Sequence, residues 1–348
     1  MKVLLVSPQM ENPNGGIAVW TDTYLNNCAG VGLDCDLLNT APMGKRAENG
    51  NAKRNFFVEI KRSRGIFRNL SKLLKGAKYD VAHLNTSCGT FGIIRDYLTA
   101  KKIKKFDKSI KLLVHFHCDV PVQITNSISK LYLKKLLKLS DANLVLCENS
   151  KKYLSNEFDS ESEKIPNFIN ENLLVSKKDI SPEIKKVLFV GRVSEEKGAF
   201  EAFKVASAFP EITFEFVGAY SDDVIETNLP LNVHLLGTMP HEKVVSKLDE
   251  SDLFLFPSHS EGFSIALMEA MARGVPVIST DVGANQDMLE EKGGKVVSVG
   301  DVEAMCQAIQ HMHSPEVRKR MSEWVVNKIK DKYVTGVVMD LLARAYQK

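Results

Sequence analysis

No uninterrupted apolar run in this 348-residue sequence reaches the roughly 18 residues that a membrane-spanning helix requires. The apolar stretch within residues 1–8 is too short for the hydrophobic region of a signal peptide, and no small-residue cleavage site follows it, so it predicts a first buried strand. The six cysteines include no C-x-x-C pair, which favours a reducing compartment over a disulfide framework or a zinc site. We therefore expect a cytoplasmic protein that holds no metal.

Charge is unevenly distributed along a chain of ordinary globular composition, with 44% hydrophobic and 26% charged residues. Residues 1–165 contain 26 basic and 16 acidic side chains, a net charge of +10, whereas residues 166–348 contain 20 and 27, a net charge of −7. The length suggests two domains of roughly 100–200 residues each. The opposite charges indicate that one of these domains is suited to an anionic partner.

Short β-branched or apolar runs alternate with longer helical patterns along the sequence. Such alternation predicts βαβ units and parallel sheets that are covered by helices on both faces. The expected strands are residues 2–6, 35–38, 81–84, 111–116 and 143–146 in the first half, and 186–190, 213–217, 232–235, 253–256, 275–280 and 294–297 in the second. Helical patterns include residues 17–28, 127–139, 199–208, 240–249 and 264–272.

The strand–helix pattern occurs twice, so we predict an α/β protein with two Rossmann-like domains. A polar, proline-containing stretch around residues 160–185 interrupts the pattern. We place the N-terminal domain at residues 1–165 and the C-terminal domain at residues 166–332. The helical pattern over residues 333–348 is expected to join the N-terminal domain.

Two adjacent glycines, Gly15 and Gly16, follow the first strand and precede a helix. Glycines let the backbone approach a ligand closely, and the N–H groups of a helix N-terminus favour an anion such as phosphate. The segment lacks the G-x-G-x-x-G fingerprint, which disfavours an NAD oxidoreductase. A structural tight turn explains the two glycines equally well.

A second glycine-containing loop follows the predicted strand at residues 186–190 and carries two cations. Gly191 ends the strand, Arg192 follows directly, and Lys197 comes five residues later, before a helix. Open α/β sheets bind ligands at the carboxyl ends of their strands. There an arginine can hold a phosphate with two donors, and a lysine acts as a point charge. The alternative is a solvated loop in which the lysine pairs with a neighbouring glutamate, Glu195 or Glu196.

The most specific stretch is residues 251–280, which is typical of a strand, a loop, a helix, a glycine stop and a further strand. Glu261 lies in the loop, Gly262 begins the helix, and Glu269 lies within it. The N–H groups that follow the glycine can cap an anion, and an acid such as Glu269 suits the vicinal hydroxyls of a ribose. The alternative is that Glu261 only favours the helix N-terminus and that Glu269 is solvated.

This block, the arginine–lysine loop and the paired glycines together resemble the GT-B glycosyltransferases of family 4. Glu261 and Glu269 match the two acids of that family's E-x7-E pattern. Shorter segments are similar to its D-h-h-H, H, I-P-N and G-x-h motifs, namely residues 80–83, 115–117, 165–167 and 236–238. The resemblance spans nearly the whole chain. It departs from the family at Ser264, where glycine is common, and at residues 168–170, which contain no glycine.

The resemblance implies two domains that face each other across a cleft, and a retaining, metal-independent transfer of a sugar from a nucleotide-sugar. It implies that Arg192 and Lys197 neutralise the diphosphate leaving group, that Glu269 binds ribose hydroxyls and that Glu261 holds the transferred sugar. The other donor-binding residues that it implies are Gly15, Gly16, Gly191, Gly237, Thr238, Gly262, Phe263 and Ser264. A departing diphosphate gathers negative charge, so fixed cations and N–H dipoles favour the transition state over the ground state.

The expected enzyme is a hexosyltransferase that uses no cofactor and takes a UDP-sugar in preference to a GDP-sugar. Its acceptor is expected to be a glycan or a lipid-linked glycan in bacterial surface polysaccharide biosynthesis. Two other functions stay open: a nucleotide-sugar epimerase on the same scaffold, which would convert the donor without an acceptor, and a GT-B-like binding subunit without turnover. The intact set of Arg192, Lys197, Glu261 and Glu269 disfavours the binding subunit.

His115 and His117 stand two residues apart at the end of a predicted strand. The resemblance places one histidine of this segment against the transferred sugar, and we favour His117 as the catalytic one because it adjoins the loop that ends the strand. The alternatives are two satisfied core histidines, or a metal site with Asp119 as the third ligand. His83 is a further candidate, which we expect to be structural.

Lysines recur every four residues, at Lys130, Lys134 and Lys138, within an amphipathic pattern over residues 127–139. Residues 101–105 contain four more lysines. We expect either an ordinary solvated helix face or docking to anionic lipid at the inner face of the cell membrane. Nucleic acid fits less well, because no aromatic platform or recognised binding motif accompanies the lysines.

Overall fold

The structure is a computed structural model, and it divides into two compact units. The residues that it describes are 1–10, 16–41, 56–221, 224 and 228–348. The first unit comprises Met1–Asn167 and Thr335–Lys348, and the second comprises Phe168–Val334. The chain passes from one unit to the other at residues 167/168 and 334/335, whereas the sequence predicts these two boundaries two residues earlier, at 165/166 and 332/333.

Six parallel strands form the sheet of the first unit. They are β1 (Lys2–Ser7), β2 (Asp34–Asn39), β3 (Val81–Thr86), β4 (Lys111–Phe116), β5 (Ala142–Val145) and β6 (Glu163–Lys164). Their order in the sheet is β2-β1-β3-β4-β5-β6. The edge strand β6 was not expected, because two residues are too few to give a recognisable pattern. β1, β3 and β4 are buried at almost every position, as parallel strands with helices on both faces are.

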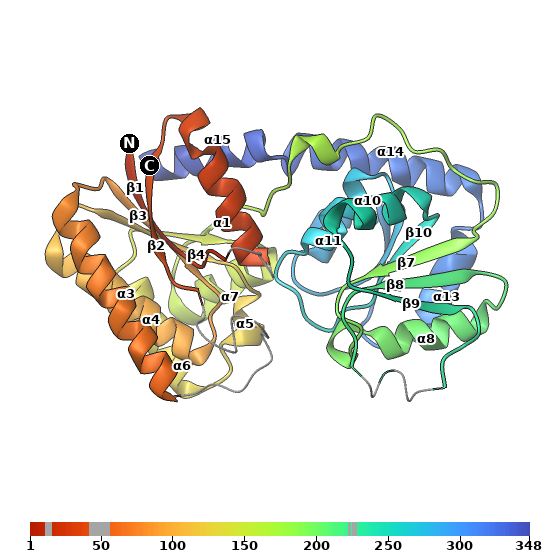
Figure 1. Cartoon of the computed structure of the whole chain (residues 1–348), viewed down its shortest axis with the longest axis horizontal. Coiled ribbons are helices and arrows are strands. Elements are labelled where there is room, and N and C mark those ends of the chain that lie inside the picture. The colour runs from red at the N-terminus through yellow and green to blue at the C-terminus, as the bar shows by residue number, and fades with distance from the viewer. Residues whose placement is uncertain (11–15, 42–55, 222–223, 225–227) are drawn as a thin grey trace. The chain divides into compact units, whose positions relative to one another are not determined.

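Helices cover both faces of this sheet (Figure 1). They are α1 (Gly16–Asn27), η1 (Cys28–Val31), α3 (Phe56–Gly76), α4 (Thr90–Phe106), α5 (Val120–Gln123), α6 (Ser127–Leu137), α7 (Glu148–Phe158) and α15 (Thr335–Gln347). Successive strand residues point to opposite faces. Leu4, Leu84 and Val114 therefore share one apolar core with residues of α3, α4 and α6. His83 and His115 point to the other face, towards α1 and α15.

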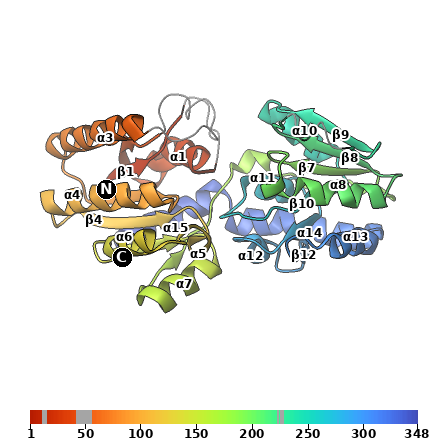
Figure 2. The ribbon, with the colours of Figure 1, turned by 90° about the horizontal axis from the view of Figure 1, so that it is seen from below.

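The second unit repeats this architecture. Its elements are η2 (Glu171–Leu173), β7 (Lys186–Val190), η3 (Glu195–Lys197), α8 (Ala199–Ala208), β8 (Thr213–Val217), β9 (Val233–Gly237), α10 (His241–Glu250), β10 (Leu253–Phe256), α11 (Ile265–Ala272), β11 (Val277–Thr280), α12 (Asn285–Leu289), β12 (Gly294–Val297), α13 (Val302–His311) and α14 (Pro315–Lys332). The sheet order is β12-β11-β10-β7-β8-β9, and all pairs are parallel. One core lies between this sheet and α8 and α13, and α8 lies in front of the strands in Figure 2.

The predicted α/β class with two Rossmann-like halves is confirmed, and most expected strands lie within two residues of the observed bounds. The predicted strand at residues 275–280 begins later, at Val277. Proline has no N–H to donate to a sheet, and Pro276 therefore ends the connection rather than joining the strand. Among the described residues, no helix has both the length and the apolar character needed to span a membrane.

The C-terminal helix α15 is fixed to the first unit by a buried chain of hydrogen bonds. The Tyr346 hydroxyl lies 2.9 Å from the Tyr24 hydroxyl and 2.5 Å from Nδ1 of His83. At the end of the helix, Lys348 forms an ion pair with Glu163 at 2.8 Å. Burial raises the pKa of the Tyr346 hydroxyl, so the hydroxyl stays protonated and able to donate.

We expect Tyr346→Phe to lower the free energy of unfolding of the full chain by about 1–3 kcal/mol, because it removes the buried hydrogen bonds to the Tyr24 hydroxyl and to Nδ1 of His83. Urea unfolding followed by circular dichroism measures this change. Tyr220→Phe, at an exposed tyrosine of the second unit, is the control and should change stability little. Equal stability of Tyr346→Phe and the wild type would contradict the structural role of this hydrogen-bond chain.

Candidate active site

The expected donor-binding residues of the second unit lie around the point where the order of the strands reverses. β7 and β10 are neighbours in the sheet, although the chain forms β8 and β9 between them. Open α/β sheets bind ligands at such a switch point, outside the carboxyl ends of the strands. The loop after β7 carries Arg192 and Lys197, and the loop after β10 carries Glu261. The structure therefore brings together two motifs that lie more than sixty residues apart in the sequence.

Glycine allows these loops to pack directly against each other. Gly198 has φ +71°, and a Cβ atom there would lie 2.0 Å from the carbonyl oxygen of Pro257. Gly283, in the loop after β11, has φ +56°, and its Cβ would lie 2.5 Å from the carbonyl oxygen of Glu261. The N–H of Ala284 donates to the carbonyl of Gly262 at 3.0 Å. Three successive loops of the sheet are thus held in backbone contact.

A third close approach brings together Gly191 and Gly237, which the sequence suggests as donor-binding residues. Between them lies Gly218, whose φ is +148° and whose Cβ would lie 1.9 Å from the carbonyl oxygen of Gly191. The N–H of Gly218 donates to the carbonyl of Gly237 at 2.9 Å. Sequence reasoning missed Gly218, although a glycine directly after the strand β8 was the available signal. Thr238 is exposed next to this contact.

Lys197 and Glu261 form an ion pair, with Nζ and Oε1 2.7 Å apart and both side chains mostly buried. The expected alternative for the lysine, pairing with Glu195 or Glu196, is wrong. Instead Arg192 contacts Glu196 at 3.2 Å, in an exposed pair. An ammonium group has three donors, and Glu261 takes one of them. This leaves N–H groups of Lys197 for an anion at the switch point.

The helix α11 presents the second acid of the pattern. Ser264 caps this helix by accepting from the N–H of Leu267 at 3.2 Å. Glu269 lies in the next turn and is only 9% exposed, so the alternative that it is a solvated side chain is wrong. Its Oε1 lies 2.7 Å from Nε2 of His241, the first residue of α10. Sequence reasoning missed this histidine, whose only signal was its position just after the Gly237–Thr238 segment.

The first unit gathers three histidines, His83 in β3, His115 in β4 and His117 just after β4, around one indole ring. The ring centroids of His83, His115 and His117 lie 5.5, 5.7 and 5.0 Å from that of Trp20. His83 and His115 are fully buried, and Nε2 of His115 lies 3.3 Å from the carbonyl oxygen of Ile165. This contact and the bond from His83 to the C-terminal helix commit both histidines to structural partners. His117 is partly exposed as a residue, although both of its ring nitrogens are buried.

Burial lowers the pKa of all three imidazoles. The pKa of His115 falls to about 3, and those of His83 and His117 fall well below the ordinary value. Transfer of a cation from water into an apolar environment is the largest cause, and the neighbouring His115 lowers the pKa of His83 and His117 further. The cluster is therefore neutral at physiological pH.

The alternative of a metal site with Asp119 is not formed. The Asp119 carboxylate instead accepts from Nδ2 of Asn149 at 2.9 Å and from the hydroxyl of Ser150 at 3.0 Å. The part of the chain that the structure describes contains no group of three His, Cys, Asp or Glu side chains arranged to hold a metal ion.

Gly15, one of the paired glycines expected to bind the donor, lies outside the described residues. At Gly16 a Cβ atom would meet nothing within 4 Å, so packing does not require glycine there.

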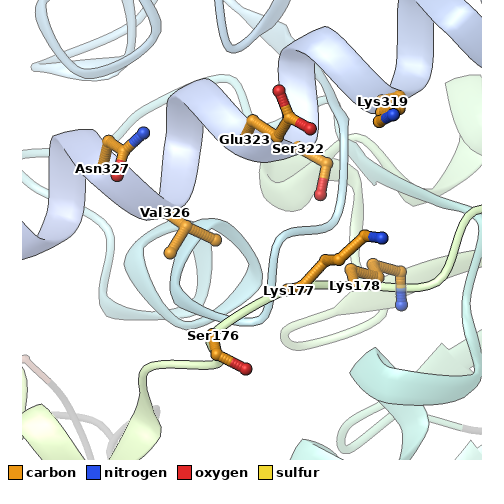
Figure 3. Close-up of a pocket in the computed structure, with 8 residues that line it drawn as sticks. All are labelled: Ser176, Lys177, Lys178, Lys319, Ser322, Glu323, Val326 and Asn327. Atoms are coloured by element: carbon orange, nitrogen blue, oxygen red, sulfur yellow. The ribbon is translucent and has the colours of Figure 1, made fainter.

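A hollow of about 80 Å³ lies elsewhere in the second unit, between residues 176–178 and α14 (Figure 3). Nζ of Lys178 donates to the carbonyls of Leu248 and Asp249, where α10 ends and the chain enters β10. The hollow therefore lies at the amino ends of the strands, opposite the loops described above. None of the expected site residues lines it.

Comparison with known proteins shows what the chain is similar to. Residues 171–325 match the family model of the glycosyl transferases group 1. An uncharacterized 41.2 kDa protein in the cps region of Klebsiella pneumoniae is 27% identical over 308 residues, which cover 81% of this chain and 82% of that protein.

Two solved structures share the fold over the full length of both chains. The apo lipopolysaccharide outer core galactosyltransferase WaaB has a TM-score of 0.74 at 18% identity, and Anabaena HepE in complex with UDP has a TM-score of 0.73 at 14% identity. The chain therefore has the GT-B fold of these proteins, and the family match over residues 171–325 supports a glycosyltransferase. Residues 171–325, which lie within the second unit, match the glycosyl transferases group 1, so this part of the chain is similar to the domain that defines that family.

The neutral histidine cluster predicts loss of stability in acid. In the unfolded chain each histidine binds a proton below about pH 6.5, whereas in the folded chain it does not, so stability falls as the pH drops below that value. Each such histidine contributes a slope of up to about 1.4 kcal/mol per pH unit. Urea unfolding from pH 7.5 to 4.5 measures the slope.

His115→Leu removes one titrating group and should flatten this slope by up to one histidine's share. His313→Gln, at an exposed histidine, is the matched control and should leave the slope unchanged. A slope that is the same in His115→Leu as in the wild type would show that the folded state protonates His115 normally.

Proposed function

We propose that this glycosyltransferase is a retaining, metal-independent enzyme of family 4. It transfers a sugar from a UDP-sugar to a glycan or a lipid-linked glycan. The observation that carries this proposal is the Lys197–Glu261 ion pair at the switch point of the second sheet, next to the loop position of Arg192. Such a cluster suits a phosphate group and an adjacent sugar, and it requires no metal to neutralise charge.

In the proposed mechanism the second unit binds the donor. Lys197 offers its remaining N–H donors to the diphosphate, and Arg192, which is half exposed, adds a second cation. As the bond from the sugar to the diphosphate breaks, charge builds on the phosphate oxygens, and these fixed cations stabilise it. Glu261, held in place by Lys197, faces the transferred sugar, and Glu269 binds the ribose. Gly191, Gly237, Gly262, Phe263 and Ser264 supply the close backbone of the site.

The first unit is proposed to serve the acceptor, with His117 as the residue that orients or polarises a sugar hydroxyl. A neutral imidazole can accept a proton from a hydroxyl group, which an imidazolium cannot do. The low pKa of His117 supports this assignment, because it keeps the ring neutral at physiological pH.

The relatives support the donor and the pathway. HepE is described in complex with UDP, and WaaB acts on the lipopolysaccharide outer core. The Klebsiella relative is named for the cps region. We therefore propose a role in bacterial surface polysaccharide biosynthesis on the cytoplasmic side of the membrane. A nucleotide-sugar epimerase is the second candidate, and it would convert the donor in the absence of any acceptor.

Arg192→Ala and Lys197→Ala should each lower turnover by about 100- to 1,000-fold, since one preorganised donor contributes about 3–4 kcal/mol to the transition state. The assay measures release of UDP from a UDP-sugar in the presence of EDTA and a bacterial glycan acceptor. Lys204→Ala removes an exposed lysine from α8 and serves as the control. Near-normal turnover of both site variants, or loss of activity in EDTA with rescue by a divalent ion, would refute the assignment.

We further propose that the first unit docks on anionic lipid through the first turns of α4 and α6. Nδ2 of Asn126 donates to the hydroxyl of Thr90 at 3.0 Å and joins these two turns. The apolar side chains of Phe91, Ile128 and Leu131 are more than half exposed there. The helix α6 also carries exposed lysines, namely Lys130, Lys134 and Lys135. An apolar patch beside lysines is the pattern of an interfacial helix.

The double variant Lys130→Ala/Lys134→Ala should weaken binding to vesicles of phosphatidylglycerol and phosphatidylcholine by about 2 kcal/mol, or roughly 30-fold, at low salt. Ile128→Ser should weaken binding too, because it removes an apolar contact with the membrane. Leu231→Ser, at a fully exposed leucine of the second unit, is the control for lost apolar surface. If the wild type does not bind these vesicles at low salt, the docking surface is wrong.

A further inference from the structure

His241 and Glu269 form a contact between two helices of the second unit that the proposed mechanism does not use. Their Nε2 and Oε1 atoms lie 2.7 Å apart. The Glu269 side chain is 11% exposed, whereas that of His241 is 57% exposed. The carboxylate thus reaches the surface beside an imidazole that is open to solvent. The preceding Gly237–Thr238 segment lies at the carboxyl end of β9, on the ligand-binding edge of the sheet.

The electrostatics of the contact favour an imidazolium. A cation at the N-terminus of a helix is normally disfavoured by the helix dipole. The pKa of His241 is nevertheless raised, chiefly by its hydrogen bond to Glu269 and against the effect of burial. The carboxylates that act on the ring are Glu269 from α11 and Glu242 from α10 itself. The protonated pair carries no net charge, whereas the deprotonated pair carries a charge of −1.

The hydrogen bond also fixes the orientation of the carboxylate. An ionised carboxylate has about four acceptor sites on its two oxygens. His241 occupies one site on Oε1, so the sites on Oε2 stay open to a ligand. A carboxylate held in this way can accept from two neighbouring hydroxyl groups without first losing rotamer freedom, which is the usual cost of ordering a glutamate side chain.

We infer that His241 is a positioning residue of the donor site, which holds Glu269 for the ribose hydroxyls of the nucleotide and makes donor binding depend on pH. This inference rests on the proposed function, because it takes the ligand of Glu269 to be a ribonucleoside diphosphate. As the pH rises through the pKa of His241, the pair becomes negative and repels the diphosphate, so the donor binds less tightly. Chemistry at the sugar does not involve His241, so kcat should change little.

Titration calorimetry of the full chain with UDP and with 2′-deoxy-UDP, from pH 5.5 to 8.5, tests this inference. In the wild type we expect loss of the 2′-hydroxyl to weaken binding about tenfold, as for a hydrogen bond to a charged group. In His241→Ala the carboxylate is no longer held, and this penalty should fall below about threefold. Glu242→Gln, which alters the neighbouring carboxylate, is the control and should keep the wild-type penalty.

His241→Gln provides the pH test, because glutamine can donate to Glu269 but does not titrate. The UDP phosphate titrates in both proteins, so the difference between them isolates the histidine. We expect UDP affinity to fall about fivefold more in the wild type than in His241→Gln between pH 5.5 and 8.5. Equal pH profiles, or an unchanged 2′-hydroxyl penalty in His241→Ala, would overturn the inference.

Failure of the proposed function gives a different result. If the wild type binds GDP or ADP but not UDP, the proposed donor is wrong. The 2′-hydroxyl penalty in His241→Ala and the pH profile of His241→Gln, measured with the nucleotide that does bind, then decide the role of His241. If the wild type binds none of these nucleotides, the proposed function and the role of His241 both fall. Thermal unfolding checks that each variant is folded. We expect the His241 variants to fold, because the side chain of His241 is exposed.

Discussion

The ion pair between Lys197 and Glu261 is the interaction on which the rest of the candidate site depends. Its two members come from loops that follow neighbouring strands, and the chain forms two other strands between them. Gly198 lets the loop of Lys197 touch the backbone of Pro257, in the loop that carries Glu261. The loop that contains Gly283 supports Glu261 from the other side. Packing of bare backbone thus sets the position of the charges, which is the preorganisation that electrostatic catalysis requires.

The two units use the same architecture for different chemical environments. In the second unit, charged groups lie at the carboxyl ends of the strands and are paired. In the first unit, the corresponding region holds the rings of Trp20 and His117, and burial lowers the pKa of the histidines there, so the region stays neutral. This contrast suits a division in which one unit holds a charged donor and the other holds an acceptor hydroxyl.

The fold could be predicted from the sequence almost completely, because buried parallel strands produce continuous apolar runs such as residues 186–190 and 253–256. The family resemblance likewise pointed to Lys197, Glu261 and Glu269 as candidate site residues. The partners of these side chains could not be predicted, since they depend on tertiary contacts. No pattern in the sequence indicates that Lys197 pairs with Glu261, or that His241 contacts a glutamate 28 residues later. Gly218 was missed because its role is to avoid a clash with another loop.

The placement of α15 affects how the protein can fold during its synthesis on the ribosome. The first unit contains Met1–Asn167 and also Thr335–Lys348, which follow the second unit in the sequence, and the Tyr346 hydroxyl closes its buried hydrogen-bond chain. All residues of the second unit are therefore synthesised before the first unit can be completed. During translation, the part of the N-terminal sheet that α15 covers therefore stays exposed until α15 has left the exit tunnel.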